Sequence, residues 1–112
     1  DMRAAAARSL GLLHAIECAT SLIGALRDEA WQVRAQAARA LGRVRAPLAT
    51  HALAERLTDA SWWVRHHAAY ALKELGEDGQ VALRQVVASS PDPYARDMAH
   101  EALTGEARRL TA

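Results

Sequence analysis

Five aromatic residues are the side chains of this sequence with the clearest capacity to bind another molecule. They are Trp31, Trp62, Trp63, Tyr70 and Tyr94, and the chain contains no Phe. Exposed Trp and Tyr supply much of the energy at protein interfaces because they bring a large rigid surface with a polar tip. If the fold holds these rings on one exposed face, the expected chemistry is recognition of a partner.

The adjacent histidines His66 and His67 are the other candidates for chemistry, because imidazole binds metals and transfers protons. Neighbouring residues on a helix point about 100° apart, so the two rings make a poor chelating pair. The sequence has no Ser-His-Asp order and no glycine-rich phosphate loop. We therefore predict no catalytic residue, no metal site and no cofactor. Cys18 has no cation beside it and is expected to be a small buried side chain.

Composition narrows the class of protein further. The chain has 112 residues, a formal net charge of +1 and 51% hydrophobic residues, which is material for one domain. A charge this close to zero argues against a nucleic-acid-binding protein, since such domains are usually strongly basic. An alanine-rich chain with six Gly and three Pro favours helices packed on helices. No run of about 18 apolar residues occurs, so we expect no membrane segment and a cytoplasmic protein.

The sequence repeats itself with a period of 31 residues. Two residue types recur at this interval, namely Arg3, Arg34, Arg65 and Arg96, and Leu10, Leu41, Leu72 and Leu103. Within a unit the apolar residues have helical spacing, as in the segment 33–44. One such unit cannot bury its apolar side alone, so the units are expected to stack on one another.

A second, shorter helix is expected after each long one. The expected ranges are about Ala15–Leu26, Pro47–Leu57 and Gln80–Ala88. Pro47 suits a first helical turn, and Gly76 suits a helix end. Asp28, Asp59 and Asp92 stand just before the next long helix, where a carboxylate can accept hydrogen bonds from the free N–H groups of the first turn.

This pattern resembles the HEAT-repeat family, and most closely its short bacterial form, the phycobilisome-lyase-type HEAT-like repeat. The resemblance is carried by Asp28, Val33-Arg34, Ala37-Ala38 and Ala40-Leu41-Gly42, and by Asp59, Val64-Arg65, Ala68-Ala69 and Ala71-Leu72. It covers about residues 1–105 and weakens in the last copy, where Ser90 replaces the first Asp. The resemblance implies that the recurring Arg and Asp residues tie neighbouring repeats together.

The expected fold is therefore all-α, a right-handed α-solenoid of about four two-helix HEAT-like repeats. The units are expected near residues 1–26, 27–57, 58–88 and 89–105. Residues 106–112 are expected to be a C-terminal extension or the start of a further helix. We expect the array to be part of a longer chain.

One stripe of the long helices varies from repeat to repeat and holds or borders every aromatic residue. The resemblance implies that this stripe faces a concave surface that binds partners. We expect a partner to contact Trp31, Arg39, Trp62, Trp63, His66, His67, Tyr70, Tyr94, Met98 and Glu101. Trp31 and Trp62 are equivalent under the 31-residue period, so packing between repeats stays open as the alternative role for these two.

The predicted function is a non-catalytic scaffold that binds a protein or peptide in the concave groove. Charges on this face are graded, with Arg39 and Arg43 toward the first repeats and Glu74 and Glu101 toward the last. A partner with one acidic end and one basic end would match this gradient. The alternatives are a regulatory or lyase-type subunit of an enzyme complex, or a HEAT-like nucleic-acid-binding module, although no nucleic acid is expected.

Overall fold

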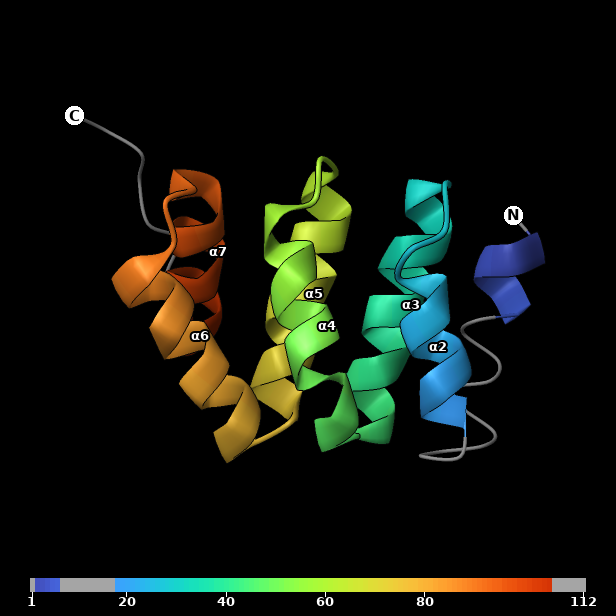
Figure 1. The fold of residues 1–112 in the computed structure, drawn as a ribbon, viewed down its shortest axis with the longest axis horizontal. Coiled ribbons are helices and arrows are strands. Elements are labelled where there is room, and N and C mark those ends of the chain that lie inside the picture. The colour runs from blue at the N-terminus through green and yellow to red at the C-terminus, as the bar shows by residue number, and fades with distance from the viewer. Residues whose placement is uncertain (1, 7–17, 106–112) are drawn as a thin grey trace.

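The computed structural model describes residues 2–6 and 18–105, and these ranges contain helices and short connections only. Residues 2–6 are helical. The elements that follow are α2 (Ala19–Ala25), α3 (Trp31–Val44), η2 (Pro47–Ala49), α4 (Thr50–Glu55), η3 (Arg56–Thr58), α5 (Trp62–Glu74), α6 (Glu77–Ser89) and α7 (Pro93–Thr104). Figure 1 shows α3, α5 and α7 side by side, with α2, α4 and α6 forming a second layer in front of them. The arrangement is an all-helical repeat solenoid.

The buried residues follow the helical spacing of the repeat. Leu41 and Leu72, which are one period apart, are fully buried, and Leu53 and Leu83 of the second layer meet them in one core. The expected helix over 47–57 is present as the run η2–α4–η3. The expected helix over 80–88 begins earlier, because Gly76 turns the chain at a φ of 77° and α6 starts directly after it. Leu10 and residues 15–17 of the first expected short helix lie outside the described residues, as do residues 106–112.

Small residues allow the long helices to approach each other closely. A Cβ atom added to Gly42 on α3 would lie 2.9 Å from the Cα atom of Ala71 on α5. Helices in contact at this distance need no large side chain between them, which explains how an alanine-rich chain fills its core without Phe. The sequence-based expectation of close helix-on-helix packing is confirmed.

The recurring Arg and Asp residues join consecutive repeats. Arg34 donates from Nε and Nη2 to the two carboxylate oxygens of Asp59 at 2.8 and 3.0 Å, and Arg3 lies 3.1 Å from a carboxylate oxygen of Asp28. The Arg34 guanidinium also donates to the main-chain carbonyl oxygen of Asp28 at 2.9 Å. The same position therefore serves stacking at these two joints, as the resemblance implies.

The acidic residues before the long helices do not all act as the helix caps that we expected. Asp92 accepts a hydrogen bond from the N–H of Tyr94, which lies in the first turn of α7. Asp28 and Asp59 instead accept from the N–H of Ala30 and of Ser61, the residues that precede α3 and α5. These two carboxylates stabilise the turn that precedes the helix. They also accept hydrogen bonds from the Arg of the preceding repeat.

The joint between the third and fourth repeats lacks this carboxylate. Ser90 takes the place of the Asp, and its hydroxyl receives the N–H of Asp92 at 3.2 Å, which preserves the turn. Arg65 donates from Nη1 to the main-chain carbonyl oxygen of Asp59, but its buried Nε has no hydrogen-bond partner among the described residues. The Arg65 position is thus conserved in the repeat while its partner is not.

The substitution Ser90→Asp is expected to stabilise the protein by about 1 kcal/mol, because a carboxylate here gives Arg65 the charged hydrogen bonds that Arg34 makes one repeat earlier. Urea unfolding measures the gain. In an Arg65→Gln background the gain should disappear. A gain that survives without Arg65 would contradict this explanation.

Candidate functional site

Four of the five aromatic residues lie outside the core, as the sequence predicts. Trp31, Trp62, Trp63 and Tyr94 are between 41% and 58% exposed. Tyr70 is half-buried and packs against the core with part of its ring. The exposed Trp side chains begin α3 and α5, so they flank one seam between two long helices.

The rings on α5 form an aromatic ladder, defined here as Trp62, Trp63, His66, His67 and Tyr70. Trp62 stacks on His66 with ring centroids 4.8 Å apart and planes inclined by 16°, and His66 lies 4.7 Å from Tyr70. Trp63 stacks on His67 at 6.4 Å and meets Trp62 edge-on at 4.9 Å. Residues four apart on a helix are neighbours, which produces the two stacks. Because the rings contact one another, their side chains are already ordered before a partner binds. Binding on this surface therefore costs little side-chain conformational entropy.

The ladder is connected to the next repeat by a hydrogen bond. The hydroxyl of Tyr70 donates to Oε2 of Glu101 on α7 at 3.3 Å. Burial raises the pKa of Tyr70 above its ordinary value, and the charge of Glu101 and this hydrogen bond raise the pKa further. Tyr70 is therefore a neutral hydrogen-bond donor at physiological pH.

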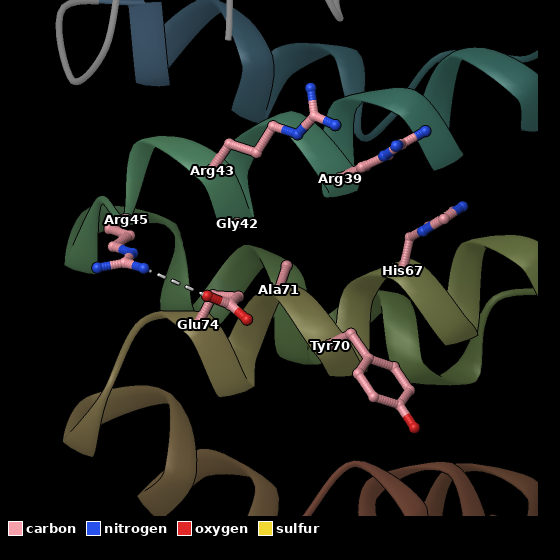
Figure 2. Close-up of a pocket in the computed structure, with 8 residues that line it drawn as sticks. All are labelled: Arg39, Gly42, Arg43, Arg45, His67, Tyr70, Ala71 and Glu74. Carbon is pink, nitrogen blue, oxygen red and sulfur yellow. Dashed lines mark ion pairs between the residues drawn. The ribbon is translucent and has the colours of Figure 1, made fainter. Parts of the chain in front are cut away.

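Two hollows lie along the seam between α3 and α5. The first, called here the basic hollow, has a volume of about 370 Å³ and is shown in Figure 2. Its lining residues are Arg39, Gly42, Arg43, Arg45, His67, Tyr70, Ala71 and Glu74. The second, called here the tryptophan hollow, has a volume of about 470 Å³. Its lining residues are Ala4, Ala5, Trp31, Gln32, Ala35, Gln36, Trp63 and His67.

The two hollows form one continuous surface because His67 lines both of them. The tryptophan hollow lies toward the beginnings of α3 and α5, and the basic hollow lies toward their ends. None of their lining residues comes from α2, α4 or α6. The surface is therefore a groove along the long-helix layer.

The basic hollow carries an excess of positive charge. Arg45 lies 3.6 Å from a carboxylate oxygen of Glu74, which is the acidic residue of the lining. Arg39 and Arg43 make no ion pair within the described part of the chain, and Figure 2 shows both side chains extending away from Glu74. Burial lowers the pKa of His67 below its ordinary value of 6.5, and the charges of His66 and Arg39 lower the pKa further.

Not every residue expected on this face lies on it. Met98 is 6% exposed and belongs to the core, because its long apolar side chain closes the seam instead of remaining in solvent. Tyr94 faces Arg65, whose guanidinium carbon lies 5.8 Å from the ring centroid.

Cys18, expected to be buried, is half-buried before α2. Among the residues that the structure describes, no three His, Cys, Asp or Glu side chains converge as metal ligands.

Arg45 was not among the residues expected on this face. Arg45 ends α3 in the left-handed conformation with a φ of 52°, which swings its side chain toward Glu74 on α5. A non-glycine residue in this conformation is uncommon. Arg45 stands where the next repeat has Gly76, but nothing in the helical spacing places its side chain on the groove.

Stacked two-layer helix pairs with equivalent Arg–Asp joints define a helical-repeat protein. A family model for HEAT repeats matches residues 1–73 and 19–104. The chain therefore belongs to the HEAT-repeat family, whose members commonly act as protein-interaction scaffolds. No curated protein matches the chain. Within residues 2–6 and 18–105, no helix has the length and apolar character needed to cross a bilayer.

The depressed pKa of His67 predicts a loss of stability on acidification. The unfolded chain takes up this proton near pH 6.5, whereas the folded protein takes it up only at lower pH. The free energy of unfolding should therefore fall as the pH drops below about 6.5 and level off below the pKa of the folded state. Urea unfolding across this range measures the effect, and His67→Gln should reduce it.

The matched control for this pH effect is His51→Gln, because the His51 side chain on α4 is 90% exposed. This variant should keep the pH dependence of the wild type. If His67→Gln and His51→Gln have the same pH profile, the environment of His67 does not cause the loss of stability.

Proposed function

We propose that this protein is a non-catalytic scaffold that binds a protein or peptide in the groove along α3 and α5. The observation that carries the proposal is the aromatic ladder on α5, whose two Trp rings are exposed and whose rings all contact one another along the helix. A rigid surface of Trp and Tyr rings beside charged side chains is typical of the energetic centre of an interface. Trp63 is the central residue, because it belongs to the ladder and also lines the tryptophan hollow.

The direct test is selection of binders from a phage-displayed library of random peptides of about twelve residues, with the 112-residue chain as target. We expect enriched peptides whose binding weakens at least tenfold, which is about 1.4 kcal/mol, when Trp63 is replaced by Ala. Fluorescence anisotropy of the labelled peptides measures the affinity. The circular dichroism spectrum of Trp63→Ala should match that of the wild type, because the side chain lies outside the core and is 52% exposed.

Leu48→Ala is the matched control, because Leu48 is an exposed apolar residue in η2 of the other layer. This variant should bind the selected peptides as the wild type does. Failure to enrich any peptide, or binding that is insensitive to Trp63→Ala, would overturn the proposal.

A further inference from the structure

We propose that the groove recognises an extended peptide in which an apolar side chain and an acidic side chain stand three or four residues apart. The apolar side chain enters the tryptophan hollow, and the carboxylate enters the basic hollow. This inference rests on the proposed function and names the chemistry of the partner.

The charges of the basic hollow select a carboxylate. Arg39, Arg43 and Arg45 face one acidic residue, Glu74, which is already 3.6 Å from Arg45. Two guanidinium groups therefore remain without an ionic partner among the described residues. A guanidinium binds a carboxylate through two parallel N–H donors, so Arg39 and Arg43 suit the side chain of an Asp or Glu. A basic side chain in this hollow would add to the existing repulsion between cations.

The tryptophan hollow selects an apolar side chain. Its walls are the rings of Trp31 and Trp63, the methyl groups of three alanines, and three polar side chains, namely Gln32, Gln36 and His67. These walls offer no ionised group, so a charged side chain would lose hydration there without a counterion. Burial of an aliphatic or aromatic side chain between two indoles removes apolar surface of both molecules from water.

Gln36 offers an unpartnered hydrogen-bond acceptor at the tryptophan hollow. Its oxygen Oε1 is buried beside the tryptophan hollow and accepts no hydrogen bond from the described residues. A buried acceptor without a donor costs free energy. Rotation of the Gln36 side chain into the hollow would let this oxygen accept the main-chain N–H of a bound peptide and would remove the cost. Gln36 lies between Trp31 and Arg39 along α3, so this hydrogen bond would fix the peptide between its two side-chain contacts.

The spacing of the two anchors follows from the geometry of α3. Trp31 and Arg39 are eight positions apart, which corresponds to about 12 Å along the helix axis at 1.5 Å per residue. An extended peptide advances about 3.3 Å per residue. About four residues therefore span the distance, so the apolar and acidic positions should be separated by three or four.

The phage selection distinguishes this inference from the proposed function. We expect the enriched peptides to share an apolar residue with an Asp or Glu three or four positions away, and replacement of that acidic residue by Asn or Gln should weaken binding at least tenfold. If the peptides depend on Trp63 but are neutral or basic, the inference is wrong and the proposed function stands. If no peptide depends on Trp63, both are wrong.

Charge reversal in the protein provides the second test. Arg39→Glu with Arg43→Glu should weaken the selected peptides at least tenfold, and a peptide with Lys in place of the acidic residue should bind this variant better than the original peptide does. The matched control is Arg27→Glu with Arg84→Glu, two exposed arginines outside both hollows that give the same change in net charge. Equal weakening by the two double variants would overturn the inference, because a general charge effect would then explain the binding.

Discussion

Asp59→Ala is expected to lower the free energy of unfolding by about 3 kcal/mol, because it leaves a largely buried guanidinium without its counterion. The Asp59 carboxylate is 3% exposed and receives Arg34 through two hydrogen bonds and the N–H of Ser61 through a third. Burial acts to raise the pKa of Asp59, but the hydrogen bonds from Arg34 and Ser61 and the charges of Arg34 and Arg56 outweigh it and lower the pKa. Urea unfolding measures the loss.

Asp28→Ala is the matched control for this loss, since Asp28 occupies the same position one repeat earlier. Asp28 and its partner Arg3 have exposed fractions of 20% and 58%, so water already screens this ion pair. We expect a loss of about 1 kcal/mol or less, mainly from the turn that Asp28 forms with Ala30. Equal losses in the two variants would show that burial does not set the strength of these joints.

Gly79→Ala is expected to destabilise the protein by about 3 kcal/mol, because α6 touches the end of α5 at this position. A Cβ atom on Gly79 would overlap the carbonyl oxygen of Leu72, so the backbone of one of the two helices must move. Because main-chain atoms cannot rotate away as a flexible side chain can, α5 and α6 have to move apart at this contact. Thermal and urea unfolding both measure the loss.

Gly24→Ala should have the opposite effect and serves as the control. Gly24 also lies within a helix, α2, but among the described residues no atom outside the backbone of α2 lies within 4 Å of the Cβ that the substitution adds. Ala has a higher helix propensity than Gly, so we expect a gain of about 0.5 kcal/mol or more. A loss of stability in both variants would contradict the role assigned to the contact between Gly79 and Leu72.

The features that could be predicted from the sequence are those that each repeat needs for stacking. The pair Arg3–Asp28 recurs one period later as Arg34–Asp59 because both joints use the same contact, and Leu41 and Leu72 recur because both layers need an apolar side chain there. The exposure of Trp63 also followed from the sequence, since its position varies between repeats. A contact that is repeated between units requires the same residue type at the same position, so it can be recognised from the 31-residue period.

The shape of the groove could not be predicted in the same way. Gln36, His67 and Met98 are equivalent under the period, yet Met98 is buried while His67 lines two hollows. This position lies at the seam between consecutive long helices, so the size and polarity of each side chain decide whether the seam is open or closed. The side-chain direction of Arg45 depends on the left-handed backbone conformation of this one residue, which cannot be deduced from helical spacing.

The serine at position 90 gives the stack an uneven stiffness. Two hydrogen bonds from Arg34 to the Asp59 carboxylate join α3 to the turn before α5, whereas α5 and α7 are joined by apolar packing and by the hydrogen bond from Tyr70 to Glu101. In a stack of repeats that are joined unequally, local opening occurs most easily at the weakest joint. Under a pulling force, α6 and α7 should therefore separate from α5 before α3 separates from α5. The groove between α3 and α5 would keep its shape while the last helical pair opens.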